Sequence, residues 1–165
     1  MKIAVVYYSH YGNTSIVAEK IADALRVYGE VDLIEIEYAE RRKGLLQRAL
    51  LRLMPQLVRL ADVKTDLGDY AVICFGLPVW AGRPSAPVNK YLKICQNIAQ
   101  KKIICFFVYA LQASADKCFA FIKKALGEKG VVELVDIYVP WAKVHEEEFL
   151  NNTIQDALKK VFKPT

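Results

Sequence analysis

Residues 5–15 read Val-Val-Tyr-Tyr-Ser-His-Tyr-Gly-Asn-Thr-Ser, and the organisation of the chain can be worked out from them. The β-branched and aromatic run that begins at Ile3 predicts a strand ending at Tyr8. Apolar residues then recur at helical spacing from Ile16 onwards, which predicts a helix from about Thr14 to Val27. A strand, a short glycine-containing turn and a helix therefore open the chain.

The turn is suited to binding an anionic group, most often a phosphate. N–H groups at the start of a helix lack carbonyl partners and lie at the positive end of the helix dipole. Gly12 lets the backbone approach a ligand closely. Polar side chains in the turn add further donors: Ser9, Asn13, Thr14 and Ser15. An ordinary capped helix is the alternative interpretation.

The composition indicates one globular domain over residues 1–165. Hydrophobic residues make up 54% of the chain and charged residues 25%, which argues against disorder. We find neither an apolar run long enough for a transmembrane segment nor a signal-peptide pattern. The four cysteines form no CxxC pair, so we expect reduced, structural thiols and a cytoplasmic location. With two histidines in the chain, we expect no metal site.

The net charge of +5 is concentrated in one segment. Six basic residues and no acidic residue lie within residues 41–61, and the rest of the chain carries 17 basic against 18 acidic residues. We treat residues 39–62 as a basic, leucine-rich helical insertion, with an amphipathic helix from Gly44 to Leu60 that Pro55 would kink. This helix either covers the sheet or docks on an acidic partner or an anionic surface. We do not expect nucleic-acid binding, because no aromatic residues accompany these arginines.

Strands and helices are predicted to alternate along the rest of the chain. Further strands are expected at residues 31–38, 70–76, 103–109 and 131–139, and further helices at 86–99, 114–128 and 146–162. This pattern predicts an α/β fold with a doubly wound, five-stranded parallel sheet, strand order 2-1-3-4-5 and helices on both faces. Ligands bind such sheets beyond the carboxyl ends of strands one and three. The rule selects the loops at residues 9–14 and 77–85.

The second of these loops carries a large aromatic residue. Residues 76–85 read Gly-Leu-Pro-Val-Trp-Ala-Gly-Arg-Pro-Ser, and the glycines and prolines predict an exposed loop. Trp80 in this loop is suited to stacking on a flat ring. Alternatively, Trp80 folds back over the end of the sheet.

Together the two loops resemble those of the flavodoxin-like FMN-binding family. Tyr-Tyr-Ser-His-Tyr-Gly-Asn-Thr is similar to the phosphate loop of that family, and Gly-Leu-Pro-Val-Trp-Ala-Gly is similar to its Gly-x-Pro-x-Trp-x-Gly loop. The resemblance implies FMN as the cofactor. It implies a phosphate site at Ser9, His10, Gly12, Asn13 and Thr14, with Tyr11 near the ribityl chain or ring. It places Pro78, Val79, Trp80, Ala81 and Gly82 beside the isoalloxazine.

The loop after the fourth predicted strand departs from the family pattern, because it lacks the usual glycines. Here Tyr109 or Leu111 would pack on the ring, and Gln112 would hydrogen-bond its pyrimidine edge. Arg83 either stabilises an anionic reduced flavin from the N1 edge of the ring or is a solvated loop arginine.

Three functions remain open from the sequence. The first is a redox protein that transfers electrons between protein partners, which suits a chain with no visible acid–base pair or nucleophile. The second is a flavin-dependent NAD(P)H:quinone or FMN oxidoreductase. The third is a flavin-free module of the same fold that binds a phosphate ligand or another protein.

Overall fold

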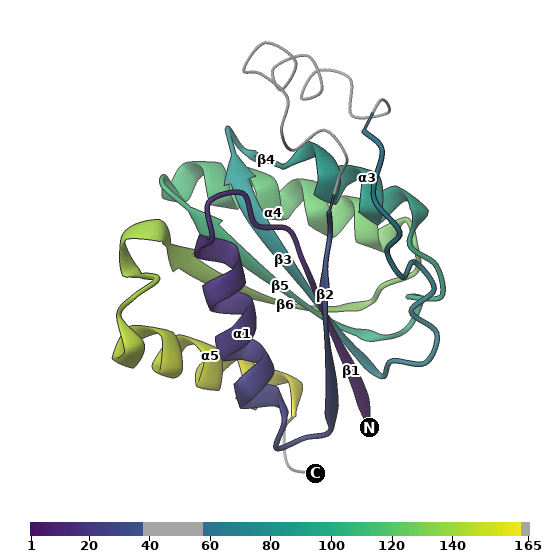
Figure 1. Ribbon diagram of the computed structural model, residues 1–165, viewed down its shortest axis with the longest axis horizontal. Helices are drawn as coiled ribbons and strands as arrows, with labels where there is room; N and C mark the ends of the chain where they lie inside the picture. The colour runs from purple at the N-terminus through teal and green to yellow at the C-terminus, as the bar shows by residue number, and fades with distance from the viewer. Residues whose placement is uncertain (38–57, 163–165) are drawn as a thin grey trace.

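The computed structural model describes residues 1–37 and 58–162, in which strands and helices alternate (Figure 1). The strands are β1 (Lys2–Tyr7), β2 (Glu30–Glu35), β3 (Val72–Trp80), β4 (Arg83–Pro84), β5 (Lys102–Tyr109) and β6 (Glu133–Pro140). The helices are α1 (Asn13–Leu25), α3 (Ala86–Ile94), α4 (Gln112–Gly127) and α5 (Glu147–Val161), with a 3₁₀ turn, η3 (Trp141–Lys143). Each strand and helix predicted within these residues is present, although α3 ends well before Ala99.

The strands form a parallel sheet in the order β2-β1-β3-β5-β6, with the short strand β4 paired antiparallel to β3. Because β4 belongs to a hairpin and not to the main ladder, this is the predicted order 2-1-3-4-5. The reversal of strand order falls between β1 and β3, where Val5 pairs with Leu33 on one side and with Cys74 on the other. The predicted doubly wound architecture is confirmed.

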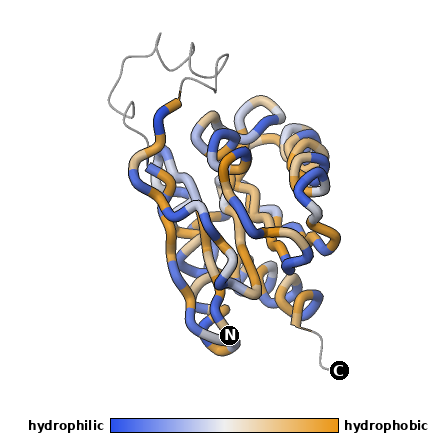
Figure 2. Tube along the Cα trace, turned by 90° about the vertical axis from the view of Figure 1, so that its right-hand side faces the viewer, coloured by the Kyte–Doolittle hydropathy of each residue, from blue (hydrophilic) through white to orange (hydrophobic). Residues whose placement is uncertain are grey.

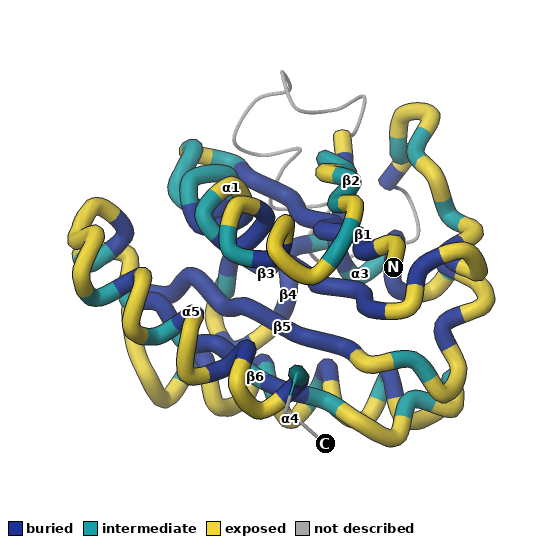
Figure 3. The backbone as a smooth tube through the Cα atoms, turned by 90° about the horizontal axis from the view of Figure 1, so that it is seen from below, coloured by how far each residue is buried: buried dark blue, intermediate teal, exposed yellow. Residues whose placement is uncertain are grey.

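Helices cover both faces of the sheet and create two cores. Successive residues of β1 point to opposite faces. Ile3 and Val5 therefore pack with α1 and α5, whereas Ala4 and Val6 pack with α3 and α4. Hydrophobic and hydrophilic residues alternate along the helices, as expected when one side of each helix faces the sheet (Figure 2). The central strands are buried, and the helices expose their outer sides (Figure 3).

The centre of the sheet is packed too tightly for a side chain at Gly76. A Cβ atom added there would lie 2.2 Å from the Phe106 ring and 2.6 Å from Tyr7 Cβ. Tyr7 and Phe106 are the register partners of Gly76 on the two neighbouring strands. Glycine at this position therefore lets β1, β3 and β5 lie in register with large side chains on both sides.

The prediction of an exposed loop at residues 77–85 is wrong for the first half of that segment. Leu77 and Pro78 continue the parallel pairing of β3 with β5, and Leu77 is fully buried. Val79 and Trp80 then pair with β4 in a hairpin. Proline usually ends a strand, but Pro78 is accommodated beyond Gly76, close to the end of the ladder.

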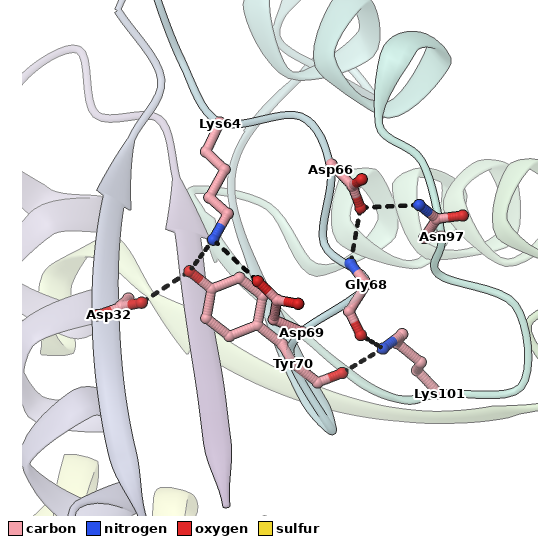
Figure 4. Close-up of polar contacts among 8 residues, drawn as sticks. All are labelled: Asp32, Lys64, Asp66, Gly68, Asp69, Tyr70, Asn97 and Lys101. Atoms are coloured by element: carbon pink, nitrogen blue, oxygen red, sulfur yellow. Dashed lines mark hydrogen bonds and ion pairs between the residues drawn. The ribbon is translucent and has the colours of Figure 1, made fainter.

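At the amino edge of the sheet, polar side chains are hydrogen-bonded to one another (Figure 4). The Tyr70 hydroxyl donates to Asp32 Oδ2 at 2.7 Å and accepts a hydrogen bond from Lys64 Nζ at 3.1 Å. The Asp66 carboxylate accepts hydrogen bonds from the Asn97 side chain at 2.8 Å and the Gly68 N–H at 2.9 Å. This network holds the segment before β3 against the loop after α3.

Most of the predicted basic insertion, including the arginine-bearing helix from Gly44, lies outside the described residues. Its last residues are described: Val58 is buried in the core on the α3 and α4 side, and residues 58–60 are not helical. The predicted helix therefore does not extend to Leu60. Across the part of the chain that the structure describes, no helix combines the length and apolarity needed to span a bilayer.

Candidate functional site

The carboxyl ends of four strands meet around one cleft of about 240 Å³. The first loop supplies His10, Tyr11, Asn13 and Thr14, and β3 supplies Pro78, Val79 and Trp80. The remaining lining residues follow or end β5 and β6: Val108, Tyr109, Ala110 and Trp141. The two loops selected from the sequence thus border the same cavity, as the rule for open α/β sheets predicts.

The first loop turns into α1 at Gly12, whose φ of +91° lies in the left-handed region. Glycine adopts this conformation without the strain that a side chain would add. The first helical hydrogen bond runs from the Ile16 N–H to the Gly12 carbonyl. The N–H groups of Asn13 and Thr14 precede it, so helix geometry gives them no carbonyl within α1. These two N–H groups lie at the positive end of the helix dipole, and their residues line the cleft.

Ser9 organises this loop from within. Its side chain is buried, and its Oγ accepts hydrogen bonds from the N–H groups of Gly12 at 3.1 Å and Ser15 at 3.3 Å. The Ser15 hydroxyl in turn donates to the Gly12 carbonyl at 2.7 Å. The Ser9 hydroxyl therefore fixes the shape of the loop.

Aromatic rings gather at the mouth of the cleft. The His10 ring lies 4.4 Å from that of Tyr11 and 5.5 Å from that of Trp80, both edge-on. The Tyr8 hydroxyl is 3.1 Å from His10 Nδ1, which links the buried Tyr8 to this group. Tyr11 is 81% exposed, so its ring is accessible to a ligand or partner.

The hairpin that carries Trp80 turns tightly at Ala81 and Gly82. Their φ angles of +49° and +76° are both positive, which is the geometry of a two-residue type I′ turn. Glycine suits this geometry, whereas Ala81 adopts it with strain. Neither residue lines the cleft, so they shape the site by aiming Trp80.

The third loop is hydrogen-bonded within the protein. The Tyr109 hydroxyl donates to Gln112 Oε1 at 2.5 Å, and Gln112 Nε2 donates to Asp116 Oδ1 at 2.9 Å. Burial, with a smaller contribution from Asp116, raises the pKa of the Tyr109 hydroxyl, which keeps it a proton donor at neutral pH. Gln112 and the exposed Leu111 do not line the cleft, so of these three predicted contacts the structure brings Tyr109 to the site.

Sequence reasoning missed Trp141, which lines the cleft from η3 and is 59% exposed. No motif marks it. A signal was nevertheless available, because a tryptophan directly after the last predicted strand must lie at the carboxyl edge of the sheet. Arg83, in contrast, turns away from the cleft: its guanidinium lies 5.2 Å from the centre of the Phe121 ring on α4.

The chemistry of the cleft is that of binding and stacking. Among residues 1–37 and 58–162, no three His, Cys, Asp or Glu side chains are grouped to hold a metal ion. All four cysteines are buried and free. Burial raises their pKa values, that of Cys118 to about 12, so these thiols stay protonated at neutral pH.

A doubly wound sheet of this order, with a glycine-containing loop before α1 and an aromatic hairpin at its switch point, has the arrangement of a flavodoxin-like fold. No protein-family model and no curated protein sequence matches the chain. Solved structures do match. A flavoprotein in complex with FMN from Lactobacillus acidophilus NCFM has a TM-score of 0.65 at 20% identity, covering 89% of this chain and 98% of its own.

Two further structures widen the comparison. Flavodoxin 1 from Bacillus cereus has a TM-score of 0.62 at 18% identity and covers both chains fully. An NADH:FMN oxidoreductase, EMOB, in its apo form has a TM-score of 0.65 at 14% identity, covering 99% of this chain and 91% of its own. At these identities the matches establish the fold, which confirms the flavodoxin-like fold expected from the two loops.

Proposed function

We propose that this chain is an FMN-binding redox protein that transfers electrons between protein partners. The observation that carries the proposal is the meeting of the two loops on one cleft. One end of that cleft offers N–H groups at a helix start, which suits a phosphate, and the other offers Trp80, which suits a flat ring. The solved flavodoxin and FMN-complexed flavoprotein of the same fold support this proposal.

The donor set fits the phosphate of FMN. The amides of Asn13 and Thr14 and the Thr14 hydroxyl would hold the phosphate oxygens, with Gly12 allowing close approach and Ser9 holding the loop in shape. His10 lines the same wall and adds a ring nitrogen. Because no Lys or Arg lies between residues 8 and 15, N–H groups and the helix dipole supply the attraction.

The walls of the cleft fit the isoalloxazine. Pro78, Val79 and Trp80 would form one side of the ring site, and Tyr109 would contribute from the neighbouring strand. When bound, FMN supplies reversible electron transfer, and the protein sets its potential through contacts and burial. The Ala81–Gly82 turn fixes where Trp80 lies.

Two other functions have an observation in their favour. A flavin-dependent NAD(P)H:quinone or FMN oxidoreductase is favoured by the likeness to EMOB and by the exposed Tyr11 and Trp141, which leave room for a second flat substrate. A flavin-free module is favoured by Ser9 Oγ, which already accepts from two N–H groups of the loop. We rank the electron carrier first because the described cleft lining includes no carboxylate, thiol or lysine.

Titration with FMN tests the proposal directly. Flavin fluorescence should fall on binding, because the ring stacks on Trp80 at the aromatic mouth. Riboflavin, which lacks the phosphate, should bind much more weakly. A protein that leaves the fluorescence of added FMN unchanged contradicts both redox functions and supports the flavin-free module.

Anaerobic mixing of the FMN-loaded protein with NADH or NADPH separates the two redox functions. A carrier should keep its visible flavin absorbance until a partner reductase is added. Direct loss of that absorbance, followed by turnover of a quinone, would instead identify the oxidoreductase.

A further inference from the structure

A second cavity, of about 500 Å³, lies between α3 and α4 on the side of the hairpin where Arg83 points. Its lining includes four cationic side chains: Arg83, Lys93, Lys124 and Lys129. Glu128 is the one carboxylate among the lining residues. We name this cavity the α3–α4 groove. It carries a local excess of positive charge on a protein whose net charge lies mostly elsewhere.

The floor of the groove is apolar. Phe121, Lys124 and Ala125 share one face of α4 by their three- and four-residue spacing, and Leu92 and Lys93 line the groove from α3. The Phe121 ring is half-buried, and its face already carries the Arg83 guanidinium. The groove thus combines an aromatic floor with a cationic rim.

The cations of the rim have no ion-pair partner within the described part of the chain. Among residues 1–37 and 58–162, no carboxylate lies within ion-pair distance of any of the four. Lys129 is held in place by the backbone, since its Nζ donates to the carbonyls of Cys95 at 2.9 Å and Lys93 at 3.2 Å. Lys93 and Lys124 are exposed. Contacts within the protein therefore hold Arg83 and Lys129 in place. The exposed side chains of Lys93 and Lys124 can reach a ligand.

We propose that the α3–α4 groove binds an acidic segment of a partner protein, with carboxylates on the cationic rim and an apolar side chain on Phe121. The charge of the groove attracts such a segment and excludes basic ones. The rim lysines are exposed, and the lining holds no fully buried polar side chain that would orient a small anion. An extended row of carboxylates fits this arrangement better than a single phosphate.

The position of the groove links it to the cleft. Arg83 is the register partner of Trp80 across the β3–β4 hairpin, and Trp80 lines the cleft. A partner seated on Arg83 therefore lies directly behind the hairpin that borders the proposed flavin site. In this respect the inference rests on the proposed function, because it names the kind of redox partner that would dock there.

A labelled peptide of Glu-Glu-Leu repeats tests the proposal by fluorescence anisotropy, with flavin-free and FMN-loaded protein measured separately. We expect saturable binding that weakens with added salt. Lys124→Glu should weaken it about tenfold, as expected when one favourable charge contact becomes repulsive. Lys123→Glu is the matched control: it makes the same charge change at the neighbouring exposed position, outside the groove, and should weaken binding less than twofold.

Further arms test the floor and the ligand class. Phe121→Ala should weaken the Glu-Glu-Leu peptide severalfold and a Glu-Glu-Ser peptide less, because the serine peptide loses only the positioning of Arg83; circular dichroism checks folding. Equal effects of Lys123→Glu and Lys124→Glu, equal binding of a Lys-Lys-Leu peptide, or displacement of the peptide by low millimolar inorganic phosphate would each overturn the proposal. Peptide binding by a protein that takes up no FMN would refute the flavin function and leave the docking site standing.

Discussion

The two ends of the sheet use their polar groups in opposite ways. At the amino edge, Asp32, Lys64, Asp66 and Tyr70 are hydrogen-bonded to other residues of the chain (Figure 4). At the carboxyl edge, the first turn of α1 presents N–H groups to a cleft lined by aromatic rings. The amino edge thus uses polar side chains to hold the fold together, whereas at the carboxyl edge the N–H groups of Asn13 and Thr14 have no carbonyl partner within α1.

The largest effect that would test this contrast is expected at Trp80. Trp80→Ala should weaken FMN binding about ten- to a hundredfold, equivalent to roughly 1–3 kcal/mol for losing one aromatic stacking partner. The stability of the flavin-free protein should change little, because Trp80 is half-buried at the end of its strand. Fluorescence titration measures the affinity and urea denaturation the stability. A Trp80→Ala variant that binds FMN as tightly as the parent would show that Trp80 does not contact the flavin ring.

A smaller effect is expected at the hairpin turn. Gly82→Ala should cost about 1–2 kcal/mol of unfolding free energy, because a side chain at φ +76° is strained. Its Cβ would also lie 3.2 Å from Lys117 Cβ. Urea denaturation measures the loss. The matched control is Gly127→Ala at the end of α4, where nothing lies within 4 Å of an added Cβ and stability should hold or rise. Equal losses at both glycines would contradict the strain argument.

At the amino edge, Tyr70→Phe should lower the unfolding free energy by about 1 kcal/mol, the combined net value of the two hydrogen bonds that its hydroxyl makes. The hydroxyl removed donates to Asp32 and accepts from Lys64. FMN affinity should stay unchanged, because the substitution lies at the other end of the sheet. Measuring both quantities on Tyr70→Phe and Trp80→Ala gives a crossed test. A drop in FMN affinity for Tyr70→Phe would show that the two ends are not independent.

The smallest expected effect depends on pH. The hydrogen bond from Asn97, followed by that from the Gly68 N–H, lowers the pKa of Asp66. A lowered pKa stabilises the folded protein above the unfolded pKa, and this stabilisation is lost as the pH falls through the folded pKa. Asn97→Gly removes the side-chain donor without straining the φ of +59° found there.

The stability difference between the parent and Asn97→Gly should therefore be largest near neutral pH. It should shrink as the pH falls below about 4, where Asp66 is protonated first in the unfolded state and, at lower pH, in the folded state. Urea denaturation across this pH range checks it. A difference that stays constant with pH would show that the Asn97 amide does not act on the Asp66 carboxylate.

The sheet could be predicted because its strands and helices differ in hydrophobic period. The uninterrupted apolar run from Ile103 to Tyr109 indicated a strand buried on both faces, and β5 is such a strand. The extension of β3 to Trp80 could not be predicted by the same rule. A proline such as Pro78 usually ends a strand, and an Ala-Gly pair is a weak signal for a type I′ turn.

Side-chain direction limited the prediction of the site. The sequence placed Arg83 and Gln112 in the correct loops, but tertiary packing decides where their ends lie. Arg83 turns to Phe121 on α4, and Gln112 is held between Tyr109 and Asp116. Trp141 was missed because it joins the cleft through the end of β6, far along the chain from both motifs.

The contact at Gly76 has a consequence for how this sequence can change over evolution. Its neighbours on β1 and β5 leave no volume for even a methyl group, since an added Cβ would clash with both the Phe106 ring and Tyr7 Cβ. Glycine should therefore be retained at position 76 among related chains, even where the aromatic ring at position 106 is replaced by a smaller side chain.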